Sequence, residues 1–321
     1  MADRMDLRGK RILVAGADGF LAHHVLAELE KRGARDVARA DRRDCDLREQ
    51  ADVRRLLAEA KPQVVVNLAG LVGGILVNTQ RPAEFFYDNL TAGTLLMHES
   101  WRAGVEKYAA CMCGCSYPDT DSPLISEAML WDGPPQRNSA PYGSAKRLLP
   151  VQAEAYRRQY GFRAIVLVPG NIYGPHENFS LNDAHVIPSL IRKFYEARRD
   201  GAPRVTVWGS GSPVRDFVYA GDAAEAIVLA LETYDGAEIV NISSGTATSV
   251  RELVTLIAEL FNYRGEIVWD ASKPDGQARK IFDTGRMRLL LGYECRTTLR
   301  EGLEKTIAWL EENYPRGTVR L

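Results

Sequence analysis

The sequence predicts an α/β protein built on a doubly wound parallel sheet, with a second and smaller α/β domain. Two observations predict this fold class. Short apolar runs, which suit strands buried on both faces, alternate with amphipathic helical stretches. A glycine-containing turn also follows the first apolar run and opens the first helical stretch.

The elements follow one another in that pattern. The first strand is expected at residues 11–15, and apolar residues at Leu21, Val25 and Leu29 then indicate a helix. The sequence predicts further strands at 64–67, 108–112 and 164–168, separated by helices that include 51–60, 83–101 and 145–160. After Gly170 we expect a loop at 171–184 and helices at 186–199, 249–261 and 299–313.

After Gly170 the regular alternation of strands and helices becomes looser, and this change suggests the domain boundaries. Residues 1–170, with about 216–243, are expected to form the sheet domain. Residues 171–215 and 244–321 are expected to form the smaller domain, which would close over the carboxyl ends of the strands and bind the substrate.

Composition narrows the class of protein. The 321 residues carry 41 basic and 42 acidic side chains, so the basic surface of a nucleic-acid-binding protein is not expected. No apolar run approaches the roughly 18 residues of a membrane span, and the first residues are unlike a signal peptide. The five cysteines, an odd number, favour a reducing compartment, and we expect a cytoplasmic protein.

The turn Gly16-Ala-Asp-Gly19 follows the first strand. Glycines at such a turn let the backbone approach a pyrophosphate at the helix N-terminus, as in a Rossmann dinucleotide site. We therefore expect Gly16, Gly19, Phe20 and Leu21 to contact a nicotinamide dinucleotide.

Residues at the end of the second strand leave the cofactor's identity open. Asp41 can accept a hydrogen bond from a ribose 2′-hydroxyl, which favours NAD, whereas Arg42 and its arginine neighbours can bind a 2′-phosphate, which favours NADP. Asp46 and Leu47 follow and are expected near the adenine.

Tyr142 and Lys146 are four residues apart and so lie on one face of a helix. A nearby ammonium favours the phenolate, so Lys146 is expected to lower the pKa of Tyr142 from its usual value of about 10. Together with the glycine turn, the pair predicts redox chemistry at a carbonyl or carbinol. Cys111, Cys113 and Cys115 are expected to share one face of a strand, but no second cysteine pair completes a zinc site, so no metal is expected.

Further motifs occur in one order along the chain. They are Val72-Gly-Gly-Ile75, Cys115-Ser-Tyr-Pro118, Asn171-Ile-Tyr-Gly-Pro175, His185-Val-Ile-Pro188, Val207-Trp-Gly-Ser-Gly211, Arg215-Asp-Phe217 and Lys273-Pro-Asp-Gly276. With these motifs nearly the whole chain resembles the extended short-chain dehydrogenase/reductases, and within them the GDP-L-fucose synthase family.

That resemblance implies an NADP(H)-dependent enzyme, with NAD not excluded, that epimerises C3 and C5 of a GDP-4-keto-6-deoxy sugar and then reduces C4. It implies acid/base roles for Cys115 and His185 and proton donation by Tyr142, with Lys146 at the nicotinamide ribose. It also implies a homodimer packed through helices 83–101 and 145–160. The remaining implied contacts are Ala69, Pro169, Asn171 and Ile172 for the cofactor, and Asn178 and Trp208 for the GDP-sugar. Lys193, Arg215 and Lys280 are candidates for the diphosphate of that sugar nucleotide, because guanidinium and ammonium groups suit anionic oxygens.

Cys113 departs from the family, which usually has a serine there to hydrogen-bond the C4 oxygen. A thiol is the weaker donor. Ser139, or Ser116 on what is expected to be the opposite face of the strand, are candidate replacements. Two alternatives therefore stay open: a C4-reductase or 3,5-epimerase of a different deoxy, dideoxy or heptose GDP-sugar, and a non-catalytic nucleotide-binding scaffold.

Overall fold

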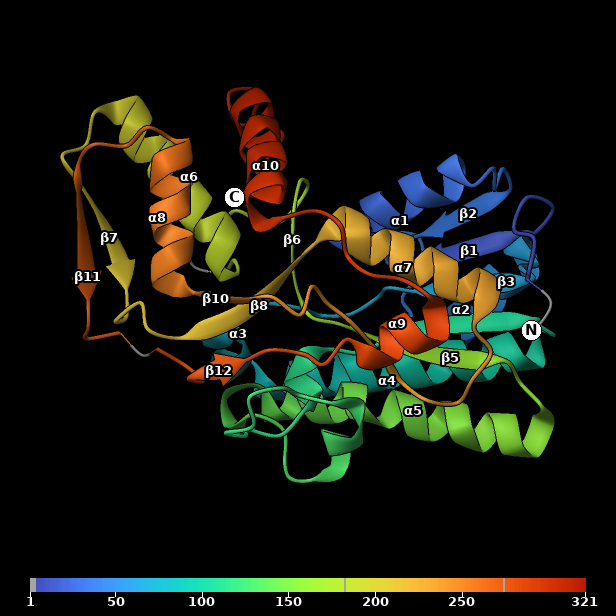
Figure 1. Ribbon diagram of the computed structural model, residues 1–321. Helices are drawn as coiled ribbons and strands as arrows, with labels where there is room; N and C mark the ends of the chain where they lie inside the picture. The colour runs from blue at the N-terminus through green and yellow to red at the C-terminus, as the bar shows by residue number, and fades with distance from the viewer. Residues whose placement is uncertain (1–3, 182, 274) are drawn as a thin grey trace.

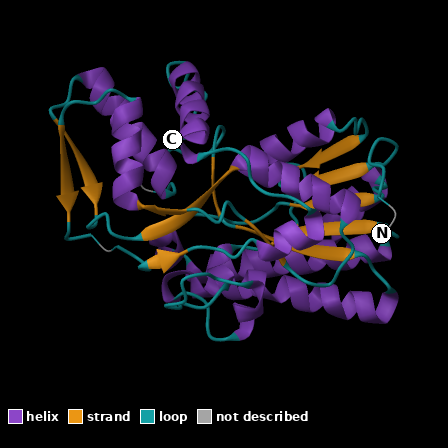
Figure 2. Cartoon of the chain, viewed as in Figure 1, coloured by secondary structure: helices purple, strands orange, loops and turns teal. Residues whose placement is uncertain are grey.

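The computed structural model describes residues 4–181, 183–273 and 275–321, so Pro274 of the C-terminal motif lies outside the described residues. The chain forms a large sheet covered by helices and a smaller part with its own short strands (Figures 1 and 2). No helix within the described residues is both long and apolar enough to cross a membrane.

The large sheet confirms the predicted fold class. Its six strands are all parallel, in the order β2-β1-β3-β4-β5-β9. They are β1 (Ile12–Ala15), β2 (Val37–Ala40), β3 (Val64–Asn67), β4 (Lys107–Cys111), β5 (Ala164–Pro169) and β9 (Val240–Ile242). The chain runs outward from β1 to β2 and then returns to the other side of β1 at β3, and such a switch point is where doubly wound sheets bind ligands.

Helices cover both faces because alternate strand residues point to opposite sides. Ile12 and Val14 pack in one core with α1 (Phe20–Lys31), α7 (Ala220–Thr233) and α9 (Gly285–Leu291). Leu13 and Ala15 pack in the other with α2 (Gln50–Ala60), α4 (Pro82–Arg102) and α5 (Ala140–Tyr160). Helix α9 lies in the segment 244–321 that the sequence assigned to the smaller domain, yet its Met287 and Leu291 belong to the first core.

The smaller part has a third core, formed mainly by α6 (Val186–Asp200), α8 (Val250–Leu260) and α10 (Leu299–Asn313). Capping boxes at Ser249 and Thr298 start the last two helices, each with a glutamate at the third helical position. Its strands are β6 (Asn171–Tyr173), β7 (Arg204–Trp208), β8 (Val214–Tyr219), β10 (Ala247–Ser249), β11 (Glu266–Asp270) and β12 (Arg279–Lys280). Strand β6 replaces the start of the loop expected at 171–184, because it pairs with β8, which is distant in sequence.

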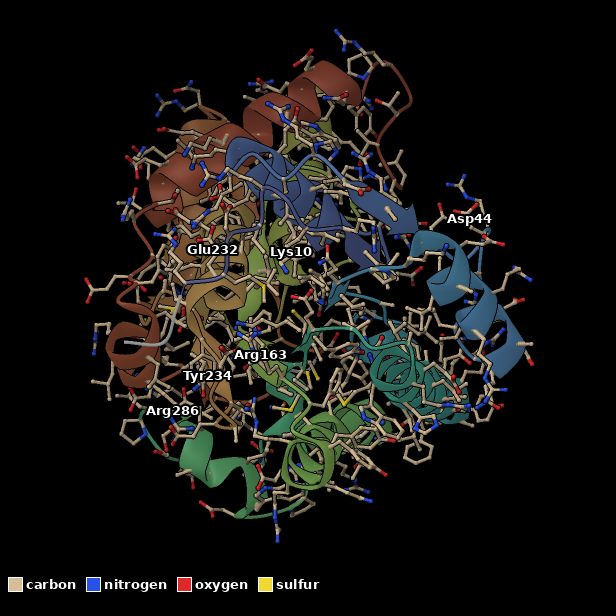
Figure 3. The ribbon with its side chains drawn as sticks, turned by 90° about the vertical axis from the view of Figure 1, so that its right-hand side faces the viewer. Lys10, Asp44, Arg163, Glu232, Tyr234 and Arg286 are labelled. Carbon is tan, nitrogen blue, oxygen red and sulfur yellow. The ribbon has the colours of Figure 1, made fainter. Side chains whose placement is uncertain are left out.

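The carboxyl ends of the large sheet face the smaller part (Figure 1). The opposite end carries charged side chains at the surface (Figure 3), where Lys10 pairs with Glu106 at 2.6 Å and Arg163 pairs with Asp235. Exposed pairs such as Lys10–Glu106 contribute little to stability, whereas Asp235 also pairs at 2.9 Å with the buried Lys107. The residues singled out by the sequence lie instead toward the carboxyl edge, where the two parts meet.

Candidate active site

The glycine turn lies at the switch point of the sheet. Gly16 has φ +78°, and a Cβ built on it would lie 2.8 Å from the Cα of Ala69, so only glycine allows the loops after β1 and β3 to meet. Gly19 is the N-cap of α1 and has no side chain to cap the amides of the first turn, which begins with Phe20 and Leu21. The turn therefore presents helix-terminal N–H groups, which suit an anion.

Lys146 reaches the same place from α5. Its Nζ donates to the carbonyl of Ala69 at 2.9 Å, and the side chain is buried. A Cβ on Gly70 would lie 3.0 Å from that Nζ, so the chain is pressed closely against the lysine. Lys146 and Ala69, both expected at the cofactor, are thus in direct contact.

Ion pairs organise the side chains after β2. Arg43 donates to both carboxylate oxygens of Asp41, and this hydrogen bonding lowers the pKa of Asp41 to about 2. Arg48 binds Asp46 in the same way and likewise lowers its pKa to about 2. Arg42 lies 3.5 Å from Asp88 and is otherwise exposed, so its guanidinium can turn toward a phosphate. Leu47 packs against the second core.

The cysteines do not share one face of a strand, which corrects the expectation from alternation. Strand β4 ends at Cys111, and Gly114–Ser116 forms one turn of 3₁₀-helix, η1. Because the backbone curls there, Ser116 does not point away from Cys113 as predicted: its Oγ lies 3.4 Å from the Cys113 Sγ. The Ser116 hydroxyl donates to the carbonyl of Gly143 at 3.0 Å.

Close packing fixes this cysteine turn, residues 113–116. A Cβ on Gly143 would lie 2.4 Å from the carbonyl oxygen of Cys115, and a Cβ on Gly114 would lie 2.5 Å from the Phe282 ring. Arg147 also donates to the carbonyl of Ser116 with its Nε at 2.8 Å. The turn is therefore held against α5 on one side and against the segment after β12 on the other.

Cys115 lies among groups that stabilise its thiolate. A hydrogen bond with Cys113 lowers its pKa most, burial opposes this, and Lys280, a hydrogen bond from Ser139 and the charge of His185 lower the pKa further. The Lys280 Nζ lies 3.8 Å from the Cys115 Sγ. Lys280, expected at the diphosphate, is thus placed beside the thiol, and Ser139 bonds that thiol too.

His185 is the N-cap of α6. The charge of Cys115 contributes to raising the pKa of His185. Its Nδ1 lies 2.9 Å from Glu177, whose carboxyl is buried. The side chain of His185 is 53% exposed; partial desolvation of the ring opposes protonation, but the hydrogen bond with Glu177 and its charge raise the pKa of His185 overall. Sequence reasoning missed Glu177, because an acid eight residues before a histidine is no recognisable motif.

Tyr142 differs from expectation in its protonation. Burial raises its pKa well above the usual value, and the neighbouring Cys113 and Cys115 raise it further. The predicted lowering by Lys146 is not found: burial lowers the pKa of that lysine as well, and its Nζ bonds to Ala69. The structure therefore holds Tyr142 as a neutral phenol that can donate a proton.

Two further clusters lie beside these groups. Trp208 is 52% exposed, and the Nζ atoms of Lys193 and Lys273 each lie 5.4 Å from its ring centroid, at cation–π distance. Arg215 is partly buried, and burial lowers its pKa while nearby Asp275 opposes this. Asn178 accepts a hydrogen bond from the backbone N–H of Ser180, on the loop before His185.

The link from β5 to β6 carries the other expected cofactor residues. Pro169 ends β5, and Asn171 donates to the carbonyl of Asp216 at 2.8 Å while Ile172 pairs with Val218. Asp216 itself is fully buried and accepts hydrogen bonds from Ser244, Gly245 and Phe282. The sequence placed Asp216 in a motif but predicted no role for it; its carboxylate links β8 to both neighbouring segments.

Comparison with known proteins identifies the family of this chain. The model of the family described as "NAD dependent epimerase/dehydratase family" matches residues 12–243. The chain belongs to the NAD dependent epimerase/dehydratase family. A GDP-L-fucose synthase of Sinorhizobium fredii is 39% identical over 94% of this chain and 95% of its own, and one of Arabidopsis thaliana is 36% identical over 96% and 95%.

Two solved structures are also similar to this chain. A GDP-L-fucose synthetase from Naegleria fowleri bound to NADP has a TM-score of 0.90 and 27% identity, covering 100% of this chain and 99% of its own. A GDP-6-OMe-4-keto-L-xylo-heptose reductase from C. jejuni also has a TM-score of 0.90, with 25% identity over 97% and 99%.

The residues of this family member fit a dinucleotide. The Gly16–Ala69 approach forms a cradle that a Cβ would fill, the Gly19 cap leaves amides for a pyrophosphate, and Lys146 stands at the next loop. Within the described part of the chain, no group of three or more His, Cys, Asp or Glu side chains is arranged to hold a metal ion.

Proposed function

We propose that this protein acts as a GDP-L-fucose synthase, converting a GDP-4-keto-6-deoxy sugar by epimerisation at C3 and C5 and reduction at C4 with NADPH. One observation carries the proposal beyond the relatives' names. The Lys280 Nζ lies 3.8 Å from the Cys115 Sγ, and Glu177 lies 2.9 Å from the His185 Nδ1. These contacts favour a thiolate at Cys115 and an imidazolium at His185, so the two side chains can act as base and acid. The neutral Tyr142 lies beside the same turn.

Epimerisation needs a base on one face of the sugar and an acid on the other. The C4 ketone acidifies the protons at C3 and C5. The Cys115 thiolate would accept such a proton, leaving an enolate, and the His185 imidazolium would return one to the opposite face. Glu177, hydrogen-bonded to Nδ1, orients the ring so that Nε2 is left to face the sugar.

Reduction needs a proton donor at the C4 oxygen. Hydride for C4 would come from NADPH when the cofactor is bound. Tyr142, kept neutral by its burial, would donate its phenolic proton to the developing alkoxide, and Lys146 would hold the ribose of the cofactor. Cys113 contacts both Cys115 and Tyr142 and stands where a serine is usual, so its thiol would donate the weaker second hydrogen bond to the ketone.

The cofactor and nucleotide would occupy the flanking clusters. Gly16, Gly19, Phe20 and Leu21 would receive the pyrophosphate, with Asp41, Arg42, Asp46 and Leu47 at the adenosine end and Ala69, Pro169, Asn171 and Ile172 along the nicotinamide. Lys193, Trp208 and Arg215, with Asn178 on the loop before His185, would receive the GDP. A nucleotide base stacked on Trp208 would lie close to the ammonium groups of Lys193 and Lys273.

The test is direct. The purified protein is mixed with GDP-4-keto-6-deoxy-D-mannose and NADPH, cofactor oxidation is followed by absorbance, and the product is identified by NMR. A 6-deoxy-L-galactose product supports the proposal. Reduction without inversion would replace it with a C4-reductase, the activity named for the C. jejuni neighbour. Cofactor binding with no turnover of any keto-sugar would leave the scaffold.

A second measurement separates the two steps. Replacing Cys115 with Ala removes the base, so deuterium from the solvent should no longer enter C3 and C5, while the ketone is still reduced. If the Cys115→Ala variant inverted the sugar at the wild-type rate, the assignment of Cys115 would be wrong.

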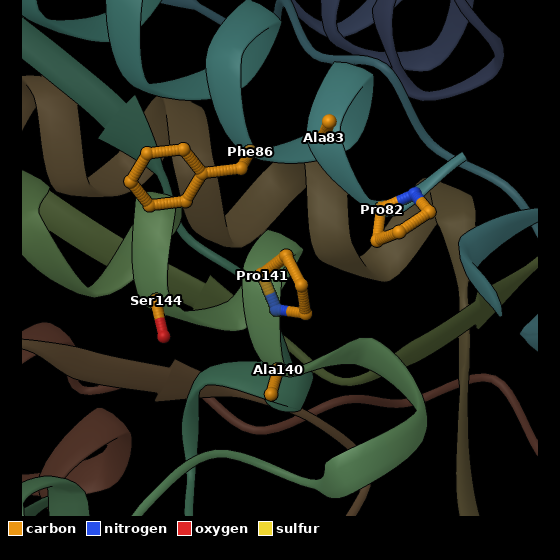
Figure 4. Close-up of a pocket in the computed structure, with 6 residues that line it drawn as sticks. All are labelled: Pro82, Ala83, Phe86, Ala140, Pro141 and Ser144. Carbon is orange, nitrogen blue, oxygen red and sulfur yellow. The ribbon is translucent and has the colours of Figure 1, made fainter.

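We also infer a homodimer in the cytoplasm. A mostly apolar pocket of about 500 Å³ lies between the first turns of α4 and α5, lined by Pro82, Ala83, Phe86, Ala140, Pro141 and Ser144 (Figure 4). Phe86, Leu148 and Val151 are exposed on the same two helices, which suits burial against a second copy. All five cysteines are free, which suits a reducing compartment.

A further inference from the structure

Lys280 is buried beside the cysteine turn. Strand β12 pairs with β8 so that Lys280 aligns with Arg215. Lys280 is only 7% exposed. The preceding Arg279 is exposed and donates instead to the carbonyl of Pro123 at 3.1 Å. Strand alternation therefore sends one cation outward and the next one inward.

The contacts of Lys280 point to the thiol. Its Nζ lies 3.8 Å from the Cys115 Sγ, and Phe282, which presses on Gly114, lies at cation–π distance, 5.9 Å from the same Nζ. Among the described residues, no carboxylate forms an ion pair with Lys280. A buried ammonium needs an anionic or polar partner, and the sulfur is the one at hand.

We propose that Lys280 is a positioning residue that holds Cys115 as a thiolate, and so makes this cysteine the base of the epimerisation. The proposal deepens, and rests on, the function proposed above. Lys280 would touch neither the sugar ring nor the cofactor; it would act through the sulfur. It replaces the expectation that this lysine neutralises the diphosphate, a task left to Arg215 and Lys193.

Among the described residues, the titratable groups that act most strongly on the sulfur are Cys113, Lys280 and His185; Tyr142 lies beside them, and Glu177 is hydrogen-bonded to His185. Cys113 and Tyr142 are neutral, because the pKa of each is raised. The positive charge near the sulfur therefore comes from His185 and Lys280. Removing one ammonium at contact distance should raise the pH at which Cys115 ionises by about one unit or more. At any pH well below the wild-type midpoint, the fraction of thiolate would then fall by about tenfold.

Alkylation tests this without any sugar. Wild-type protein and the Lys280→Met variant react with iodoacetamide over a range of pH, and mass spectrometry follows the peptide containing Cys115. The midpoint of its reactivity should rise by about one unit in Lys280→Met and return toward wild type in Lys280→Arg. Arg279→Met, which removes the neighbouring cation that points outward, is the matched control and should leave the midpoint unchanged.

Kinetics then distinguish the two roles of the lysine. At a pH well below the wild-type midpoint, incorporation of solvent deuterium at C3 and C5 should slow by about tenfold in Lys280→Met, with little change in KM for the GDP-sugar. An unchanged midpoint, or a large rise in KM with an unchanged kcat, would overturn the proposal and return Lys280 to the diphosphate. Lys280→Gln, which keeps a polar end, provides the same measurement should the Met variant not fold. Failure of the sugar assay alone would count against the enzyme function, because alkylation needs no substrate.

Discussion

The approach of helix α5 to the cysteine turn can be tested with one methyl group. Gly143 lies one residue after Tyr142, and a Cβ added there would lie 2.4 Å from the carbonyl oxygen of Cys115 and 2.9 Å from the Cβ of Pro135. The first distance is about 1 Å short of ordinary van der Waals contact. Because the nearer obstacle is backbone, the turn or the helix must move by roughly that amount in the Gly143→Ala variant.

The expected effect differs between stability and turnover. Overpacking costs about 1–3 kcal/mol, and alanine in place of glycine inside a helix recovers about 1 kcal/mol, so the net loss should be about 0–2 kcal/mol. A displacement of about 1 Å between catalytic groups can cost about 100-fold in rate. Since Gly143 lies between Tyr142 and the Cys115 turn, reduction and epimerisation should both fall by about that factor.

The assay is NADPH oxidation with the GDP-keto-sugar, alongside deuterium incorporation and thermal unfolding. Gly9→Ala is the control, since nothing lies within 4 Å of a Cβ built on Gly9, and it should keep wild-type turnover. Turnover of Gly143→Ala within about twofold of wild type would refute the reasoning, because the turn would then tolerate the shift.

Three further variants test other parts of the site. Cys113→Ser restores a hydroxyl donor near Tyr142 and should raise the rate of ketone reduction by up to about 100-fold, measured as kcat for NADPH oxidation; an unchanged or lower rate would mean that the thiol is not the donor. In Glu177→Gln the hydrogen bond to His185 persists but the charge that raises the histidine pKa is lost, so the imidazolium deprotonates at a lower pH and the alkaline limb of deuterium exchange should move downward; an upward or absent shift would contradict this. Asp216→Asn sets an amide against the N–H groups of Gly245 and Phe282 and should cost about 1–3 kcal/mol by chemical denaturation, whereas unchanged stability would show that the network is dispensable.

The local sequence pattern was sufficient to predict the main secondary-structure elements of this protein. The alternation of strands and helices, the glycine turn before α1 and the placement of Tyr142 and Lys146 on one helix each follow from neighbours within a few residues, and each is found as predicted. The periodicity of side chains along a strand or helix records which face is buried, so one sequence suffices to predict it.

Tertiary structure alone decided the charge state of the site. Lys280 and Cys115 are 165 residues apart, and their contact depends on how β12 pairs with β8. The neutral phenol of Tyr142 follows from burial, which overrides the ammonium that the sequence places one turn away. A pKa depends on solvent exclusion and on charges from every segment packed around a group, and neither quantity can be derived from local spacing.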